Sequence, residues 1–326
     1  MANENYGVAI SYCKFLTIVV LLTLSHPLVE ALNNLDLMHH GTVKTIESEE
    51  GEVIDCVGIY KQPAFNHPLI EDLQYAQASQ YDGIYYGLQA IINVWNPKTE
   101  EGGLGEFSIS QVWVVSLNRS DPTNLNSVEA GWIVSPTMFG DNKTRFFIFW
   151  TRDNYRTTGC YNLNCPGFVQ TNHKFIIGNS IAPVSTYNGK SYEISITIFK
   201  DGESGNWWLE VQGEVVGYWP SSIFTGLANN ANIVSWGGEI INSRAAGHHT
   251  TTQMGSGHFA AEGFHKSSYF RNLKVIDDAG NTQDPDNLQP HVSNSKCYDL
   301  QFQENKQTSF GTCFYYGGPG YSLDCP

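Results

Sequence analysis

Two glutamates, far apart along the chain, lie inside apolar runs that are rich in Gly and Trp. Glu129 belongs to the run Glu129–Trp132, and Glu239 belongs to the run Ser235–Ile240. An unpaired carboxylate is costly to bury, so each acid either lies on a solvated strand edge or belongs to a site that uses it. Two carboxylates that share a pocket can have different pKa values and act together as an acid and a base.

Side-chain alternation places both acids beside small residues if the two runs are strands. Glu129 would share a face with Gly131, and Glu239 would share a face with Gly237. A glycine next to a carboxylate removes side-chain bulk and lets another backbone or a ligand approach closely. The pattern therefore predicts a surface across which a peptide or a sugar chain could lie.

The composition indicates an all-β protein. Of 326 residues, 41% are hydrophobic and 13% are aromatic, and 31 Gly and 13 Pro interrupt the apolar runs. Charged residues make up only 15% of the chain, below the roughly 25% that is usual in soluble domains. The net charge of −14 argues against a nucleic-acid partner, because phosphates would be repelled.

Runs of strand type follow one another from residue 79 onward. Residues 107–115 alternate, with Phe107, Ile109, Gln111 and Trp113 on one face. Further expected strands are 84–95 as one long strand, 145–150, 192–199, 207–212 and 269–276. About a dozen strands without a repeat period predict a large antiparallel β-sandwich of jelly-roll or concanavalin-like type.

The first 31 residues have the features of a signal peptide. Phe15–Ser25 is apolar, is preceded by Lys14 and is too short to span a bilayer, and Val29–Ala31 offers a small-residue cleavage site. We therefore expect a secreted protein without stable membrane insertion. Residues 32–76 differ in composition and predict a short leader, followed by the β domain at 77–326. The sequence specifies no oligomeric state.

The cysteine content suits an oxidising compartment. Cys160 and Cys165 flank a tight loop that a local disulfide could close, and a bridge from Cys297 to Cys325 would pin the C-terminal segment. Cys13 lies in the expected signal peptide and would be removed with it, and Cys56 and Cys313 remain unassigned. The spacing does not suggest a zinc site, and we expect no metal.

Two N-glycosylation sequons begin at Asn118 and Asn142. Both fall in turn-like segments, where a glycan could face solvent. The sequence therefore predicts a glycoprotein with sugars at these two positions.

Many blocks of the sequence, in order, resemble the plant neprosin-type glutamic peptidases over nearly all of the chain after the signal peptide. Residues 54–68 are similar to the activation-peptide motif of that family, although this leader is shorter than the family's usual one. In the main domain the resemblance is carried by residues 129–132, 140–142, 159–162, 167–171, 206–208, 217–220, 236–239, 253–257 and 315–320.

The resemblance implies a β-sandwich that cleaves peptides after proline at acidic pH and needs no cofactor. It places the two catalytic glutamates of the family at Glu129 and Glu239. It also pairs Cys160 with Cys165 and Cys297 with Cys325. The expected partners are peptide or protein substrates that contain proline.

Amide hydrolysis needs an activated water and a proton for the leaving nitrogen. One ionised glutamate could take a proton from water, while the other, protonated, polarises the carbonyl and donates to the amine. Two close carboxylates titrate as a pair, with one pKa raised, which predicts an acidic optimum. The sequence does not assign the two roles.

Four further residues are candidates for substrate binding. Gln111 and Gln253 lie in strand-like runs and could bind a carbonyl oxygen or the peptide backbone. Trp113 and Trp132 could pack a proline ring, although packing in the core is the expected role of either.

Two other classes of function remain open on the same residues. Large sandwiches with exposed aromatic residues can bind polysaccharides without catalysis. Two carboxylates about 5–9.5 Å apart could also hydrolyse a glycosidic bond.

Overall fold

The computed structural model describes residues 42–47, 53–57, 73–100, 105–243, 248–303 and 309–326. The chain divides into two units, Met1–Glu71 and Asp72–Pro326. In the first unit, β1 (Thr42–Glu47) and β2 (Val53–Val57) pair antiparallel. The predicted signal peptide at 1–31 lies outside the described residues. The predicted boundary between residues 76 and 77 falls inside a strand of the second unit that begins at Leu73.

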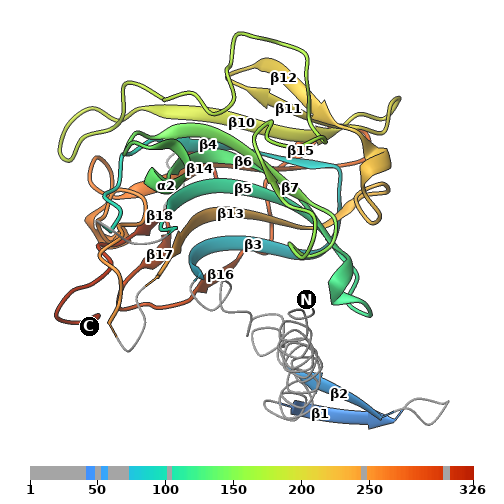
Figure 1. The fold of residues 1–326 in the computed structure, drawn as a ribbon, viewed down its shortest axis with the longest axis horizontal. Coiled ribbons are helices and arrows are strands. Elements are labelled where there is room, and N and C mark those ends of the chain that lie inside the picture. The colour runs from blue at the N-terminus through green and yellow to red at the C-terminus, as the bar shows by residue number, and fades with distance from the viewer. Residues whose placement is uncertain (1–41, 48–52, 58–72, 101–104, 244–247, 304–308) are drawn as a thin grey trace, which may run out of the picture. The chain divides into compact units, whose positions relative to one another are not determined.

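Two antiparallel sheets form the second unit (Figure 1). In spatial order, the first sheet contains β16 (Gln289–Val292), β3 (Leu73–Tyr85), β13 (Ala231–Ile241), β5 (Ser108–Leu117), β6 (Leu125–Val134), β7 (Arg145–Thr151) and β8 (Cys160–Tyr161). The second contains β17 (Asp299–Phe302), β18 (Phe314–Gly317), β14 (Ser268–Ile276), β4 (Gly87–Asn93), β10 (Glu193–Lys200), β11 (Trp207–Val211), β12 (Glu214–Trp219) and β9 (Val169–Gln170), with β15 (Thr282–Gln283) beside β14. The predicted all-β sandwich is confirmed.

The described helical elements are single turns in the connections between strands. They are η3 (Pro122–Asn124), α2 (Pro136–Phe139), η4 (Ser221–Ile223) and η5 (Ala260–Glu262). Within the described ranges, no helix has the length and apolar character needed to cross a membrane.

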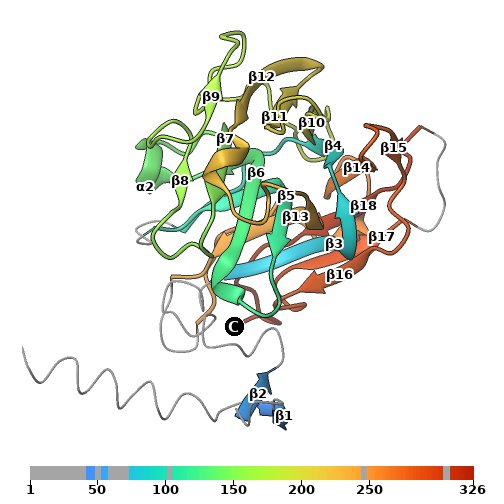
Figure 2. The same ribbon diagram turned by 90° about the vertical axis from the view of Figure 1, so that its right-hand side faces the viewer.

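The main core lies between the two sheets (Figure 2). Its largest side chains include four tryptophans with no solvent exposure: Trp132, Trp207, Trp219 and Trp236. On β6 the alternation sends Ala130 and Trp132 into this core and leaves Glu129 on the opposite face. The core therefore fixes which side chains the first sheet presents on its other side.

The single strand predicted over residues 84–95 is wrong. The chain leaves the first sheet at the end of β3, bends at Tyr86 and enters the second sheet as β4 at Gly87. Gly87 has φ +154°, and a Cβ atom there would lie 2.3 Å from the carbonyl oxygen of Ile198. The apolar run reads as continuous because hydrophobic residues stand on both sides of the bend, although Ile84 is exposed at the end of β3 and the residues after Gly87 are mostly buried in the second sheet.

Two disulfides join the predicted cysteine pairs, Cys160–Cys165 and Cys297–Cys325. Cys313 is a buried free thiol. The sequon residues Asn118 and Asn142 are both exposed, and their glycosylation stays a prediction.

Candidate active site

The face of the first sheet that points away from the main core carries both glutamates. Glu129 on β6 lies opposite Trp113 on β5, and Glu239 on β13 lies opposite Ile109 on β5. Opposed residues on neighbouring antiparallel strands point to the same face. Ile109 and Trp113 share one face of β5, as the alternation predicted, so this strand brings the two acids together.

Gln111 occupies the position between the glutamates. It lies opposite Gly131 on β6 and opposite Gly237 on β13. A Cβ atom at Gly131 would lie 2.7 Å from the Cα of Gln111, and one at Gly237 would lie 2.5 Å from the Cα of Gln77. The two glycines therefore leave a floor without side chains on either side of Gln111, with the glutamates diagonally across it.

Glu129 is buried, with 4% of its surface exposed. The Ser127 hydroxyl donates to its Oε1 at 2.6 Å, and the Tyr155 hydroxyl donates to the same oxygen at 2.8 Å. Burial raises the pKa of Glu129 to about 7, although the hydrogen bonds from Ser127 and Tyr155, and to a smaller extent the nearby amide of Gln111, lower it in part. Each of these donors stabilises the ionised carboxylate.

Glu239 is less buried than Glu129 and receives fewer hydrogen bonds. The Gln111 amide Nε2 donates to its Oε2 at 3.2 Å. Burial and then the negative charge of Glu129 raise the pKa of Glu239 to about 8, against a smaller lowering by Gln111. The proton that the pair retains therefore resides preferentially on Glu239.

Aromatic rings line the site on both sides. Phe149 stacks on Tyr155 at a centroid distance of 5.8 Å and meets Tyr161 edge-on at 4.7 Å. Across the sheet, Tyr75 on β3 lies opposite Glu239. Burial raises the pKa of both Tyr75 and Tyr161, and the charges of the two glutamates raise it further. Both phenols therefore stay protonated and can donate hydrogen bonds to a substrate.

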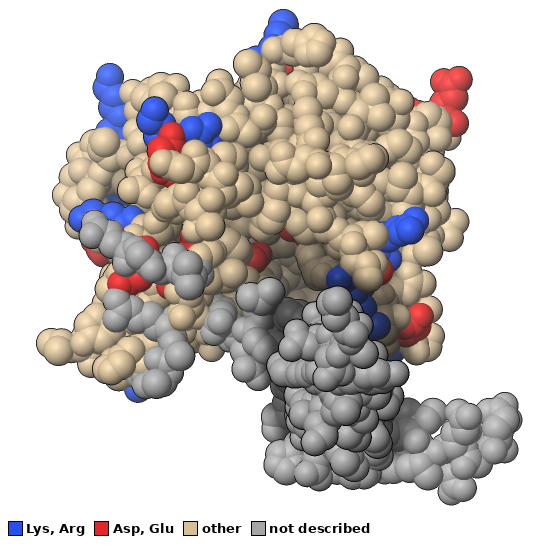
Figure 3. Space-filling view, viewed as in Figure 1, with Lys and Arg blue, Asp and Glu red and all other residues tan. Residues whose placement is uncertain are grey.

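The surface seen in Figure 3 is mainly uncharged. Lys and Arg side chains lie toward the rim of this view, and its broad centre carries few charged groups.

Two of the four predicted binding residues lie on this face. Gln111 is 1% exposed, and its Oε1 atom is buried without a hydrogen-bond partner among the described residues. That oxygen is available to a substrate N–H or a water molecule. Trp113 is 6% exposed beside Glu129, so its contact with substrate stays a prediction.

The other two predicted binding residues lie elsewhere. Trp132 is fully buried between the sheets, where its Nε1 donates to the carbonyl oxygen of Asn93 at 3.0 Å. The side chain of Gln253 accepts from the backbone N–H of Lys98 at 3.0 Å and fixes a loop. Strand alternation explains the position of Trp132, because it differs in phase from Glu129 by three residues and therefore points into the core.

Sequence reasoning missed Ser127, Tyr155, Tyr75 and Tyr161. Ser127 could have been found, since it lies two residues before Glu129 on the same strand face. Tyr155 has φ +60° in the turn that follows β7. That conformation is uncommon for a residue other than glycine, and the sequence carries no signal for it.

A family model described as Neprosin matches residues 104–319. Among solved structures, Scytalido-glutamic peptidase with a peptide-based transition-state analog is 13% identical and covers 76% of this chain and 98% of that chain, with a TM-score of 0.39. SCP-B, an Eqolisin-family peptidase in complex with the tripeptide Ala-Ile-His, is 12% identical over 74% of this chain and 96% of that chain, with a TM-score of 0.38. CG-16, a homodimeric agglutinin from chicken liver, is 9% identical over 52% of this chain and 96% of that chain, with a TM-score of 0.27.

Proposed function

This chain belongs to the Neprosin family, and from that premise we propose how its two glutamates hydrolyse peptide bonds. The protein is a glutamic endopeptidase, as the sequence resemblance implied. The observation that carries the mechanism is the unequal set of donors around the pair: two hydroxyls on Glu129, and one amide on Glu239.

Glu129 is the general base in this proposal. The hydroxyls of Ser127 and Tyr155 stabilise its ionised form, so it accepts a proton from the attacking water. The buried Oε1 of Gln111 lies between the acids and can accept the second hydrogen of that water. The water is thereby oriented toward a carbonyl carbon above the glycine floor.

Glu239 is the general acid. Its raised pKa keeps the proton that polarises the scissile carbonyl and then passes to the departing amine. Tyr75, opposite Glu239, is placed to donate a hydrogen bond to the developing oxyanion. After cleavage the proton taken by Glu129 returns to the pair, and the site is ready for another turnover.

The pH range follows from the two pKa values. Burial raises the pKa of both glutamates, so the pair holds a single proton between its two ionisations. Activity should fall on the acid side as Glu129 becomes protonated and on the alkaline side as Glu239 loses its proton, and the acidic optimum that the resemblance implies stays a prediction. A substrate that hydrogen-bonds ionised Glu129 would lower its pKa and extend activity toward acid.

We propose proline as the residue before the cleaved bond and the cell exterior as the location. The aromatic group of Phe149, Tyr155 and Tyr161 beside Glu129 offers ring faces against which a proline ring can pack. The signal-peptide features at the N-terminus and the two disulfides agree with secretion.

The test is incubation of the purified protein with two peptides that differ only by proline or alanine before the bond, and with cell-wall glycans. The proposal predicts cleavage after proline, slower cleavage after alanine, and no released sugar. Equal cleavage of both peptides would remove the proline preference. Glycan binding without turnover would instead support a non-catalytic polysaccharide-binding protein. Released sugars would support a glycosidase.

A further inference from the structure

A buried histidine in another part of the second unit lies against the disulfide between Cys297 and Cys325. His249 is 7% exposed, and the two cysteines are 0% and 2% exposed. A ring nitrogen of His249 and the two Sγ atoms all lie within 4.8 Å of one another. Three groups that commonly bind transition metals therefore converge in one buried place.

The hydrogen bonds of His249 determine which ring nitrogen presents a lone pair. Nδ1 lies 2.9 Å from the carbonyl oxygen of Thr250, and because that oxygen can only accept, Nδ1 carries the proton. Nε2 of the neutral ring is then an acceptor, and it is buried without a hydrogen-bond partner among the described residues. Metal-binding histidines have this arrangement, with one N–H donated to a backbone carbonyl.

The neighbouring backbone is held in place on several sides. The hydroxyls of Thr250 and Thr252 donate to the buried carboxylate of Glu106. The Tyr298 hydroxyl donates to the carbonyl oxygen of Thr252 at 2.8 Å, and the N–H of Tyr321 donates to that of Thr250 at 2.7 Å. Such support is what a metal site needs to keep its ligands in position.

We propose that Cys297, Cys325 and His249 form a Zn²⁺ site when the disulfide is reduced. A dithiol reductant supplies two electrons and two protons, becomes a disulfide itself, and leaves two thiols on the protein. Zn²⁺ then binds both sulfurs and the His249 nitrogen, and the two thiol protons are released. Two thiolates neutralise the charge of the ion, and Cys₂His with an open fourth position is an established zinc ligand set.

The required movement is small. Tetrahedral zinc with Zn–S bonds of about 2.3 Å holds two sulfurs roughly 3.8 Å apart, so the sulfurs must separate from bonding distance. In the oxidised protein they are bonded to each other, and the site is closed. The C-terminal segment can thus be cross-linked in two alternative ways, by a disulfide or by a metal ion.

The test is an anaerobic Co²⁺ titration of the full chain after reduction with a phosphine, which takes up the oxygen of a water molecule as the disulfide is cleaved. Cys160→Ser with Cys165→Ser serves as the background, so that the other disulfide contributes no thiols. His249→Ala removes the proposed ligand, and His248→Ala, at the exposed neighbouring position, is the matched control.

We expect the reduced background protein to bind one Co²⁺ with thiolate-to-cobalt absorption that Zn²⁺ abolishes. His249→Ala should weaken binding at least about tenfold, while His248→Ala should leave it unchanged. The absence of thiolate absorption in the reduced protein, or equal affinity in His249→Ala and His248→Ala, would overturn the proposal.

Thermal unfolding provides a readout that does not depend on the spectrum or on peptidase activity. Zn²⁺ that binds only the folded, reduced protein must raise its Tm. The increase should be large in the background and in His248→Ala and small in His249→Ala. An unchanged Tm of the reduced protein in excess Zn²⁺ would contradict the site.

Discussion

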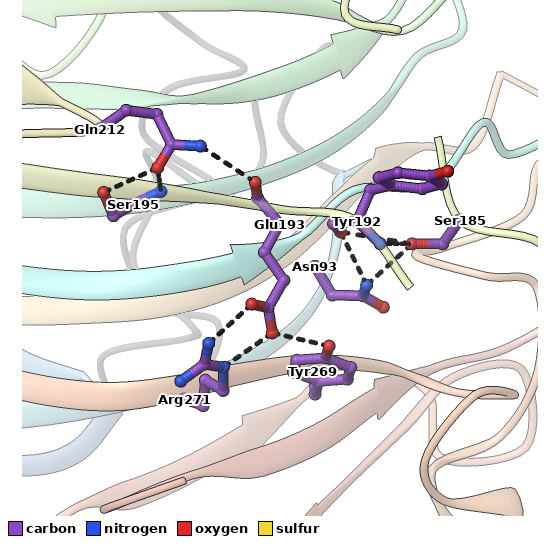
Figure 4. Close-up of polar contacts among 8 residues, drawn as sticks. All are labelled: Asn93, Ser185, Tyr192, Glu193, Ser195, Gln212, Tyr269 and Arg271. Atoms are coloured by element: carbon purple, nitrogen blue, oxygen red, sulfur yellow. Dashed lines mark hydrogen bonds and ion pairs between the residues drawn. The ribbon is translucent and has the colours of Figure 1, made fainter. Parts of the chain in front are cut away.

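Glu193 on β10 and Glu239 on β13 are both partly buried glutamates on strands of opposite sheets, yet their surroundings favour opposite charge states. Two hydrogen bonds from Arg271, of 2.7 and 2.6 Å, and one from Tyr269, of 2.7 Å, hold the carboxylate of Glu193 (Figure 4). Burial raises its pKa, but these donors lower it by more, so the pKa lies below its usual value. Glu193 is therefore ionised and structural.

The active-site pair has only neutral donors. Glu129 accepts from two hydroxyls, and Glu239 accepts from one amide and faces another carboxylate. Burial then raises both pKa values. A cation beside a partly buried glutamate thus produces a structural ion pair, whereas neutral donors in its place leave the glutamate with an exchangeable proton.

The largest expected effect is on peptidase activity, and it distinguishes the two active-site glutamates from Glu193. Glu129→Gln and Glu239→Gln should each lower kcat/KM for a proline peptide about 10³-fold or more, because an amide neither accepts nor donates the transferred proton. Glu193→Gln, the matched control, should leave kcat/KM near the wild-type value. Product formation followed by chromatography measures all three, and similar losses in all three would abolish the distinction.

The free energy of unfolding should change in the opposite order, with the larger loss in Glu193→Gln. Glu193→Gln should lower the free energy of unfolding by about 1–3 kcal/mol at neutral pH, because Arg271 keeps its charge without a carboxylate partner. The pKa of Glu193 is lowered in the folded state, so its contribution is present above the unfolded pKa and is lost as pH falls through the folded value. Urea unfolding measures the difference.

The control for this stability change is Glu214→Gln. It removes the exposed ion pair of Glu214 with Lys174, 2.6 Å apart. This loss should lower the free energy of unfolding by only about 0–1 kcal/mol. An equal cost for the two variants would mean that Arg271 and Glu193 do not stabilise the fold.

Glu239→Gln should be inactive yet more stable than the wild type at alkaline pH. The folded pKa of Glu239 is raised, so the stability linked to its proton is present below the unfolded pKa and is lost as pH rises through about 8. The variant should gain about 1–3 kcal/mol at pH values above this point and little near pH 5. Urea unfolding across this range measures the gain, and a gain independent of pH would contradict a buried, protonated Glu239.

The smallest expected effect is a shift of the pH–rate profile when one hydroxyl donor of Glu129 is removed. Tyr155→Phe keeps the ring against Phe149 but removes one hydrogen bond, so the pKa of Glu129 should rise and the acid limb of the pH–rate profile should move up by about 0.5–1 pH unit. Ser127→Ala should act in the same direction. A shift of the alkaline limb instead would exchange the roles of the two glutamates.

Much of this site follows from strand alternation. The spacing of Glu129 and Gly131, and of Ile109, Gln111 and Trp113, fixes which side chains share a face once the runs are strands. Alternation also places Trp132 on the face opposite Glu129, because the two positions differ in phase. These local regularities need no knowledge of how the strands are ordered.

The remainder depends on long-range register, which the sequence does not encode locally. Gln111 lies between the glutamates only because β5 separates β13 from β6 in the sheet. Tyr155 reaches Glu129 through a turn with positive φ, and the chain changes sheets at Tyr86 within an unbroken apolar run. Each of these features is decided by packing rather than by residue type.

Infrared titration of the carboxyl groups tests the central claim most directly. Near neutral pH, the difference spectrum of wild type minus Glu239→Gln should contain the C=O band of a protonated carboxylic acid, whereas wild type minus Glu193→Gln should contain only carboxylate bands. A Glu239 difference spectrum that shows only carboxylate would contradict the account, because neither member of the pair would then hold the proton that the departing amine requires.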